Sequence, residues 1–278
     1  MRWQSGRRSS NVQDRRGRGG MMIGGGLGAI VITVVALLLG VDPDSIPTNG
    51  AAPANEVAPG GPDQFRGVDE EADFISVVLA DTEDTWNALF ATRGETYREP
   101  QLVLFEDVVH SACGIAQSAV GPFYCPPDQQ LYLDLSFFRE LSQRFGAPGD
   151  FARAYVVAHE VGHHVQTLLG ISDDVRAAQA RASTTESNAM QVRMELQADC
   201  LAGIWAHHAQ RERQVLDPGD IEEALGAASA IGDDRLQRET QGRVVPESFT
   251  HGTSAQRTQW FRNGFDSGDP DRCDTFNG

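Results

Sequence analysis

Apolar residues recur along this chain with two different periods, and the periods predict its elements. Residues 69–94 have an acidic start, apolar positions at helical spacing and a terminal glycine, which predicts a helix. The stretches 100–109 and 129–138 are rich in Val, Leu, Phe and Tyr and predict strands. A second helix is predicted over 150–170, with Asp150 as its N-cap.

The second half of the chain is helical in pattern. Further helices are predicted over 192–210, 217–232 and 252–265. The polar, Ala-rich stretch 171–190 predicts a mobile insertion, and a lid and a self-cleaved segment are both open for it. The fold class expected is therefore α+β and mainly helical, with a small sheet placed before the helix at 150–170.

One segment near the N-terminus has the pattern of a membrane span. Residues 21–41 carry no charge and would be roughly 31 Å long as a helix, enough to cross a bilayer. The Arg-rich residues 1–20 precede it, so the positive-inside rule predicts a cytoplasmic tail followed by a single-pass anchor. The length favours a retained anchor over a cleaved signal peptide, although "AAPA" at 51–54 leaves cleavage open. A buried core helix is the alternative.

The rest of the chain is then expected outside the bacterial cytoplasm, at the cell surface or in the periplasm. Residues 42–68 are rich in Pro, Gly and Ala and predict a flexible linker, which leaves 69–278 as the folded domain. The net charge is −16, and the positive residues of 1–20 leave the remainder more acidic still. Because phosphate contacts need a basic surface, this charge argues against a nucleic-acid partner.

The segment "AHEVGHHVQT" contains the pattern His-Glu-x-x-His. Residues four apart share a helix face, so His159 and His163 can point at one metal ion. Glu160 is offset by about 100° from His159, which lets it reach a water at the metal without ligating the ion. Two neutral imidazoles and an adjacent base predict a catalytic zinc site.

A third ligand decides the kind of zinc site. The long metzincin pattern needs Gly at 166 and His at 169, whereas the sequence has Gln166 and Leu169. Downstream, Glu195 and Asp199 are four residues apart on a predicted helix and share a face. Glu195 would complete a His₂Glu set of the gluzincin type, with an open fourth position. Asp199 would accept the N–H of a metal-bound imidazole, and a solvated helix face is the alternative for both carboxylates.

The other histidines have weaker claims. His164 points away from His163 and is expected at the helix surface or beside the site. His207 and His208 lie about three turns from Glu195, too far to bind the same ion. His251, in "FTHGTSAQR", could bring an imidazole to the oxyanion of a tetrahedral intermediate, or it could be a plain surface or capping histidine.

The four cysteines have no C-x-x-C spacing, which disfavours a zinc knuckle. An even count outside the cytoplasm predicts two disulfides. The simplest pairing joins Cys113 to Cys125 and Cys200 to Cys273, and the other two pairings stay open.

Several long motifs together carry a family resemblance: "GPFYCPPD", "GDFARAYVVAHEVGHHVQ", "VRMELQADCLAGIWA", "IGDD" and "FTHGTSAQR". With these in order, residues 70–278 resemble the bacterial putative neutral zinc metallopeptidase family. The resemblance implies a zincin-like fold in a membrane-anchored or exported protein. It also implies His159, His163 and Glu195 as zinc ligands and Glu160 as the catalytic base.

The function expected is that of a membrane-anchored zinc endopeptidase acting on a peptide or protein substrate. An extended substrate would pair with an edge strand, for which residues 129–135 are the candidate, although they could equally form a central strand. Tyr155 is expected to pack rather than to act. The alternatives are a zinc-binding module without activity and a hydrolase of a non-peptide amide in the cell wall.

Overall fold

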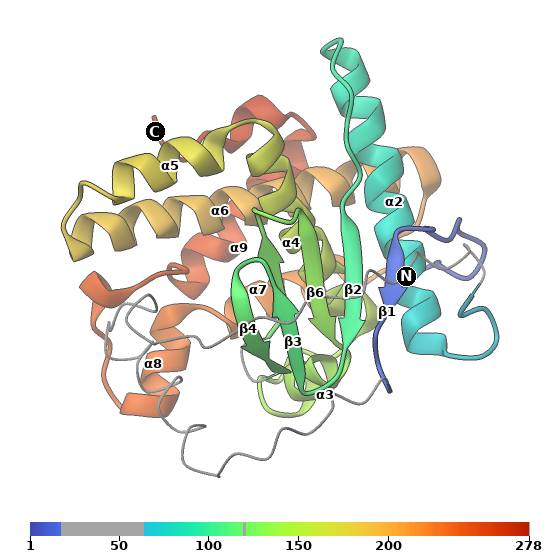
Figure 1. Ribbon diagram of the computed structural model, residues 1–278, viewed down its shortest axis with the longest axis horizontal. Helices are drawn as coiled ribbons and strands as arrows, with labels where there is room; N and C mark the ends of the chain where they lie inside the picture. Colours follow the sequence, from blue (N-terminus) through green and yellow to red (C-terminus); the bar gives the residue numbers. More distant parts are fainter. Residues whose placement is uncertain (18–63, 119–120, 278) are drawn as a thin grey trace.

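The computed structural model describes residues 1–17, 64–118 and 121–277. These form a mainly helical domain with a small sheet beside its helices (Figure 1). The sheet has the strand order β1-β2-β6-β5, and a separate hairpin pairs β3 with β4. The strands are β1 Val12–Asp14, β2 Gln101–Phe105, β3 Val108–Ser111, β4 Gly114–Gln117, β5 Phe123–Cys125 and β6 Gln130–Asp134. The expected class, helical with a small sheet before the histidine helix, is confirmed.

The sheet is mixed, and its register places β6 in the interior. β1 and β2 run parallel, as do β2 and β6, whereas β5 pairs with β6 in the antiparallel sense. The predicted strand at 100–109 is broken at Asp107, whose φ of 62° turns the chain from β2 into the hairpin. Because β6 is flanked on both sides, residues 129–135 hold a central strand, the alternative left open for them, and not an edge strand. β5 forms that edge of the sheet.

The helices agree with the predicted ones in most places. They are α2 Glu70–Thr92, α3 Ser136–Gln143, α4 Asp150–Leu168, α5 Ile171–Gln179, α6 Thr184–His208, α7 Asp220–Ala230, α8 Asp233–Gln241 and α9 Ser254–Ser267. Asp150 is the first helical residue of α4 rather than its N-cap, which is Gly149.

The predicted mobile insertion at 171–190 is wrong. This stretch forms α5 and the first turns of α6, and a capping box between Ser183 and Glu186 starts α6. Most of its polar residues face solvent, while Ser172 and Val175 are buried against the domain. The stretch is therefore ordered helix packed on the domain. The polar composition that suggested an insertion belongs to the solvent-facing side of these helices.

Helix α4 lies at the centre of the domain (Figure 1). It packs against α2, α6 and α7, and most of its side chains are buried on every face. Close packing on all sides fixes the side chains of such a helix, so α4 can hold functional groups in fixed positions. The His-Glu-x-x-His pattern lies on its second half.

Residues 1–17 are part of this domain, which corrects the prediction of a separate Arg-rich tail and a domain starting at 69. β1 adds a strand to the sheet, Trp3 packs edge-on against Phe74, and Arg8 makes a buried bidentate ion pair with Asp73. Arginines in this segment thus bind carboxylates of α2, whereas the sequence pattern alone suggested a topology signal.

Among the described residues, no helix is long and apolar enough to cross a membrane. The span predicted at 21–41 lies outside the described part, as does the linker predicted at 42–68 up to residue 63. A chain that crossed a bilayer once between residues 17 and 64 would place β1 and β2 on opposite sides. In the structure these strands are hydrogen-bonded to each other.

Two disulfides are present, with the simplest predicted pairing. Cys113 joins Cys125, with 5.8 Å between their Cα atoms, and Cys200 joins Cys273, with 5.6 Å between theirs. The first ties the turn of the β3–β4 hairpin to β5, and the second ties the C-terminal tail to α6. Neither contributes a sulfur to the predicted metal site, as expected.

Candidate metal centre

The site is assembled where α4 and α6 come unusually close. A Cβ atom on Gly162 would lie 3.0 Å from the carbonyl oxygen of Ala198 and 3.3 Å from its Cβ. Glycine at this position therefore lets the two helix backbones approach at the level of the histidines. A second close approach, of Gly203 and Gly264, brings α9 against the other face of α6.

Three ligand-type side chains converge between α4 and α6. The Nε2 atoms of His159 and His163 lie 3.1 and 3.5 Å from one carboxylate oxygen of Glu195. The three ligand atoms are within 4.8 Å of one another. Donor atoms around a tetrahedral zinc ion, each about 2.0–2.2 Å from it, lie about 3.4 Å apart. The spacing therefore fits a small divalent ion with two nitrogen ligands and one oxygen ligand.

His159 is held from behind by a buried carboxylate. Its Nδ1 lies 2.8 Å from Asp199, as the sequence predicted, so Nδ1 carries the proton and Nε2 is left as the ligand atom. Tyr155 donates its hydroxyl proton to the same carboxylate at 2.5 Å. Tyr155 thus has a polar role as well as the packing role expected for it.

Asp199 is in turn paired with a buried arginine. Arg257 on α9 donates to both carboxylate oxygens of Asp199, at 2.8 and 3.0 Å, and is only 1% exposed. Burial alone would raise the pKa of Asp199, but Arg257 and His159 outweigh it and lower the pKa to about 2. Asp199 therefore remains ionised and keeps the His159 proton on Nδ1.

The other two ligands are oriented by glutamine side chains. Nδ1 of His163 donates to the Gln166 side-chain oxygen at 2.9 Å, and Gln191 donates to Glu195 at 2.9 Å. Gln166 also donates to Gln197 at 3.0 Å, which fixes the direction of its amide. Each of the three ligands thus has its far polar atom engaged and its near atom directed at the others, which is the arrangement a resident metal ion requires.

Glu160 lies in the cleft in front of these ligands. The cleft has a volume of about 630 Å³ and is lined by Glu160 with both histidine ligands, by β5, and by side chains from α3, α5 and α6. Within the described part of the chain, Glu160 makes no hydrogen bond or ion pair. Its carboxylate is therefore available to a molecule in the cleft.

His251 also lines this cleft, and Asp233 positions it. One carboxylate oxygen of Asp233 accepts the backbone N–H groups of Thr250, His251 and Gly252, at 2.8, 2.6 and 3.0 Å. The other oxygen lies 3.3 Å from Nδ1 of His251. Burial lowers the pKa of His251, but the carboxylates of Asp233 and Glu195 together outweigh it, so the net shift is upward.

His164, His207 and His208 have structural roles. His164 is fully buried, not at the helix surface: the Tyr124 hydroxyl contacts its Nδ1 at 3.0 Å, and its Nε2 donates to the Arg98 carbonyl at 2.6 Å. Its pKa falls to about 4 because of burial. His207 and His208 bond to backbone carbonyls within and just after α9, far from the ligands along α6, as predicted.

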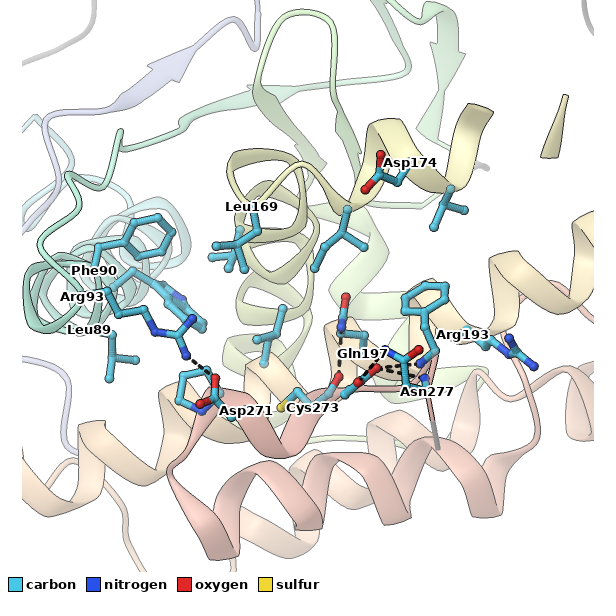
Figure 2. Close-up of a pocket in the computed structure, with 18 of the residues that line it drawn as sticks. Leu89, Phe90, Arg93, Leu169, Asp174, Arg193, Gln197, Asp271, Cys273 and Asn277 are labelled. Atoms are coloured by element: carbon cyan, nitrogen blue, oxygen red, sulfur yellow. Dashed lines mark hydrogen bonds and ion pairs between the residues drawn. The ribbon is translucent and has the colours of Figure 1, made fainter. Parts of the chain in front are cut away.

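A second hollow lies on the other side of α5 (Figure 2). It has a volume of about 760 Å³ and is bounded by α2, the ends of α4 and α5, α6 and the C-terminal tail. Its walls are mainly apolar, with an ion pair between Arg93 and Asp271 at 2.5 Å on its margin. Gln197 lines this hollow, and its side-chain amide donates to the Cys273 carbonyl at 2.9 Å. The hollow contains none of the metal-site ligands.

Sequence reasoning missed five residues of the site: Gln166, Gln191, Asp233, Arg257 and, in part, Tyr155. Gln166 and Gln191 follow or precede a ligand at helical spacing, so the periodicity around each ligand was an available signal. Asp233 and Arg257 reach the site through tertiary packing, and only the motifs "IGDD" and "HGTSAQR" marked them.

A helix with His-Glu-x-x-His beside a helix that supplies a glutamate is the site of the zinc metallopeptidase class. The chain belongs to the family described as Putative neutral zinc metallopeptidase, which matches residues 1–276. It is 51% identical over 291 residues to "Uncharacterized protein YpfJ" of Escherichia coli, with 99% of each chain covered. It is 44% identical over 253 residues to "Uncharacterized protein Rv2575" of Mycobacterium tuberculosis, covering 87% of this chain and 85% of the relative. No solved structure matches the chain.

Proposed function

We propose that the protein is a zinc-dependent endopeptidase with Glu160 as its general base. The observation that carries the proposal is the convergence of His159, His163 and Glu195 beside a Glu160 carboxylate that is bonded to none of the described residues. A structural zinc site would have no use for a free base, and a His₂Glu set leaves the fourth position open.

The three ligands would hold one zinc ion, which supplies Lewis-acid polarisation of a carbonyl and of water when bound. Glu160 takes a proton from the attacking water and passes it to the leaving amine. Asp199 keeps a proton on Nδ1 of His159, and Gln166 does the same for His163, so each ring directs its Nε2 atom at the position of the metal. His251, with Nδ1 directed at Asp233, presents its Nε2 towards the cleft, where it would donate to the developing oxyanion.

An extended peptide is the substrate that the cleft supports best. β5 lies at the edge of the sheet and lines the cleft, so its outer backbone groups are placed to pair with a substrate strand. Phe123, Phe137 and Phe145 line the same cleft and offer apolar surface for side chains on either side of the scissile bond.

The location outside the cytoplasm and a membrane association of residues 21–41 stay predictions, whereas a single crossing that leaves residues 1–17 in the cytoplasm disagrees with the β1–β2 pairing. Two disulfides support an oxidising compartment. Residues 1–17 pack on the catalytic domain and would share its side of any membrane.

Glu160→Gln tests the proposal directly. We expect the variant to bind one zinc ion as the wild type does, and to cleave a mixed peptide library on the order of 10²–10⁴-fold more slowly. Metal content is measured by elemental analysis and cleavage by mass spectrometry. Glu140→Gln, which changes another carboxylate of the same cleft, should cleave at the wild-type rate.

Two results would contradict the proposal. Cleavage by Glu160→Gln at the wild-type rate would remove the base from the mechanism. Stoichiometric zinc without cleavage of any library peptide by the wild type would point to a non-peptide amide or to a zinc-binding module.

A further inference from the structure

The edge strand β5 is tied to the helix of the metal ligands by a buried hydrogen bond. Tyr124, the middle residue of β5, belongs to the main core with α4, whereas Phe123 and Cys125 pack in the smaller cluster on the hairpin side of the sheet. The Tyr124 hydroxyl lies 3.0 Å from Nδ1 of His164 on α4. β5 is three residues long and pairs with β6 alone among the described strands. Its position therefore depends on what its side chains contact.

The imidazole of His164 is fixed from both of its nitrogen atoms. Nε2 donates to the Arg98 carbonyl at 2.6 Å, and the residue is completely buried. Because a carbonyl only accepts, Nε2 carries the proton of the neutral ring, and Nδ1 is left to accept the proton of the Tyr124 hydroxyl. The Tyr124 ring also meets the imidazole edge-on, with the ring centroids 5.4 Å apart. His164 thus offers β5 a single acceptor in a fixed place.

This hydrogen bond joins the two halves of the proposed site. His164 directly follows the ligand His163 on α4, and Phe123 and Tyr124 line the cleft in front of the ligands. A substrate strand that pairs with β5 takes its position from β5. Because the reacting atoms must lie in near-attack geometry, a misplacement of about 1 Å is enough to slow a reaction strongly. The distance between β5 and α4 therefore matters for cleavage.

We propose that Tyr124 and His164 are a positioning pair that fixes β5 against α4 and so sets where a substrate strand lies relative to the metal. Both residues act through β5. Metal binding does not require their bond, because the ligands are oriented by Asp199, Gln166 and Gln191. The role in cleavage rests on the proposed function, whereas the anchoring of β5 is measurable without any activity.

Tyr124→Phe tests the pair, because it removes the hydroxyl and keeps the ring. Hydrogen exchange of the β5 amides paired with β6 is followed by mass spectrometry on the metal-free, full-length chain. We expect this exchange to be at least about tenfold faster than in the wild type, since β5 then opens more readily. The zinc affinity of the variant, measured by competition with a chelator, should be that of the wild type.

Cleavage is compared on two peptides that share one scissile bond. One is a long peptide that the wild type cleaves, and the other is the shortest fragment around that bond that it still cleaves. In Tyr124→Phe the value of kcat/KM should fall on the order of tenfold for the long peptide and less for the short one, which pairs with less of β5. The ratio of the two values does not depend on the fraction of active enzyme, so partial unfolding cannot imitate this result.

Tyr97→Phe is the matched control. The Tyr97 ring contacts the same imidazole, with centroids 5.7 Å apart, but its buried hydroxyl has no hydrogen-bond partner among the described residues. This variant should therefore keep the wild-type exchange of β5 and the wild-type cleavage of both peptides.

Unchanged exchange of β5 in Tyr124→Phe would overturn the proposal, as would a ratio of long to short cleavage equal to that of the wild type. Equal effects in Tyr97→Phe would also overturn it, because general packing around His164 would then explain them. If β5 exchanges faster in Tyr124→Phe but the wild type cleaves no peptide, the proposed function fails and the anchoring of β5 is upheld.

Discussion

The guanidinium of Arg257 donates hydrogen bonds to both carboxylate oxygens of Asp199, and Asp199 in turn lies 2.8 Å from Nδ1 of His159. Two hydrogen bonds in series thus connect a residue of α9 to a predicted metal ligand. The carboxylate is completely buried, so its charge has to be matched inside the protein. Arg257 therefore supports the metal site through position, without touching a ligand-binding atom.

Arg257→Gln should both weaken metal binding and destabilise the fold. Removing one partner of a buried pair leaves an uncompensated charge and costs about 3–5 kcal/mol of unfolding free energy. Loss of an orienting partner typically lowers metal affinity by about 10–100-fold. Denaturant titration and competition with a zinc chelator measure the two effects. Arg262→Gln, an exposed arginine on the same helix, should change neither, and equal effects in both variants would contradict the assigned role.

Gly162→Ala tests whether the helix approach builds the site. The added Cβ would lie 3.0 Å from the Ala198 carbonyl, so α4 and α6 must separate. We expect a loss of about 1–3 kcal/mol in unfolding free energy, together with weaker zinc binding. Gly226→Ala on α7 is the control, because a Cβ there meets nothing within 4 Å. That variant should be stabilised by roughly 0.5–1 kcal/mol, through helix propensity.

The metal motif could be predicted from sequence because it depends on local geometry. His159, Glu160 and His163 lie on one helix, and the four-residue spacing fixes which of them share a face. Glu195 and Asp199 follow the same rule on a second helix. The chemistry of the site leads one to expect that the two helices meet, but neither helical pattern alone predicts the contact.

Arg257 and β1 show where that reasoning stops. Arg257 is one arginine among many until α9 packs on α6 through Gly203 and Gly264, and no local period marks it. β1 is three residues long in an Arg-rich segment, and its partner β2 lies far along the chain. The arginines of residues 1–20 precede the apolar run at 21–41 and therefore resembled a signal for membrane topology. In the structure, Arg7 and Arg8 bind acidic residues of α2.

The disulfide between Cys200 and Cys273 is connected to a metal ligand through three hydrogen bonds. Gln197 donates to the Cys273 carbonyl and accepts from Gln166, which accepts from His163. Cys200→Ser/Cys273→Ser should therefore lower zinc affinity in addition to costing about 2–5 kcal/mol of stability. Cys113→Ser/Cys125→Ser should destabilise the β3–β4 loop and leave zinc affinity unchanged. Identical zinc binding in both pairs of variants would show that the tail does not support the ligand.

The last prediction concerns pH and rests on the contact between His251 and Asp233. Because Asp233 holds the proton of the neutral ring on Nδ1, the Nε2 atom carries a proton only when the ring is protonated. Asp233 raises the pKa of His251 against the effect of burial, so the donor is present below that raised value and is lost as pH rises through it. Cleavage should therefore decline on an alkaline limb above about pH 6.5, the ordinary histidine value. Asp233→Asn removes the charge that raises the pKa and should move this limb to lower pH, seen in the pH profile of kcat. If the alkaline limb of the kcat profile stays at the same pH in Asp233→Asn, the limb belongs to the titration of another group. His251 would then only line the cleft, without a role in the reaction.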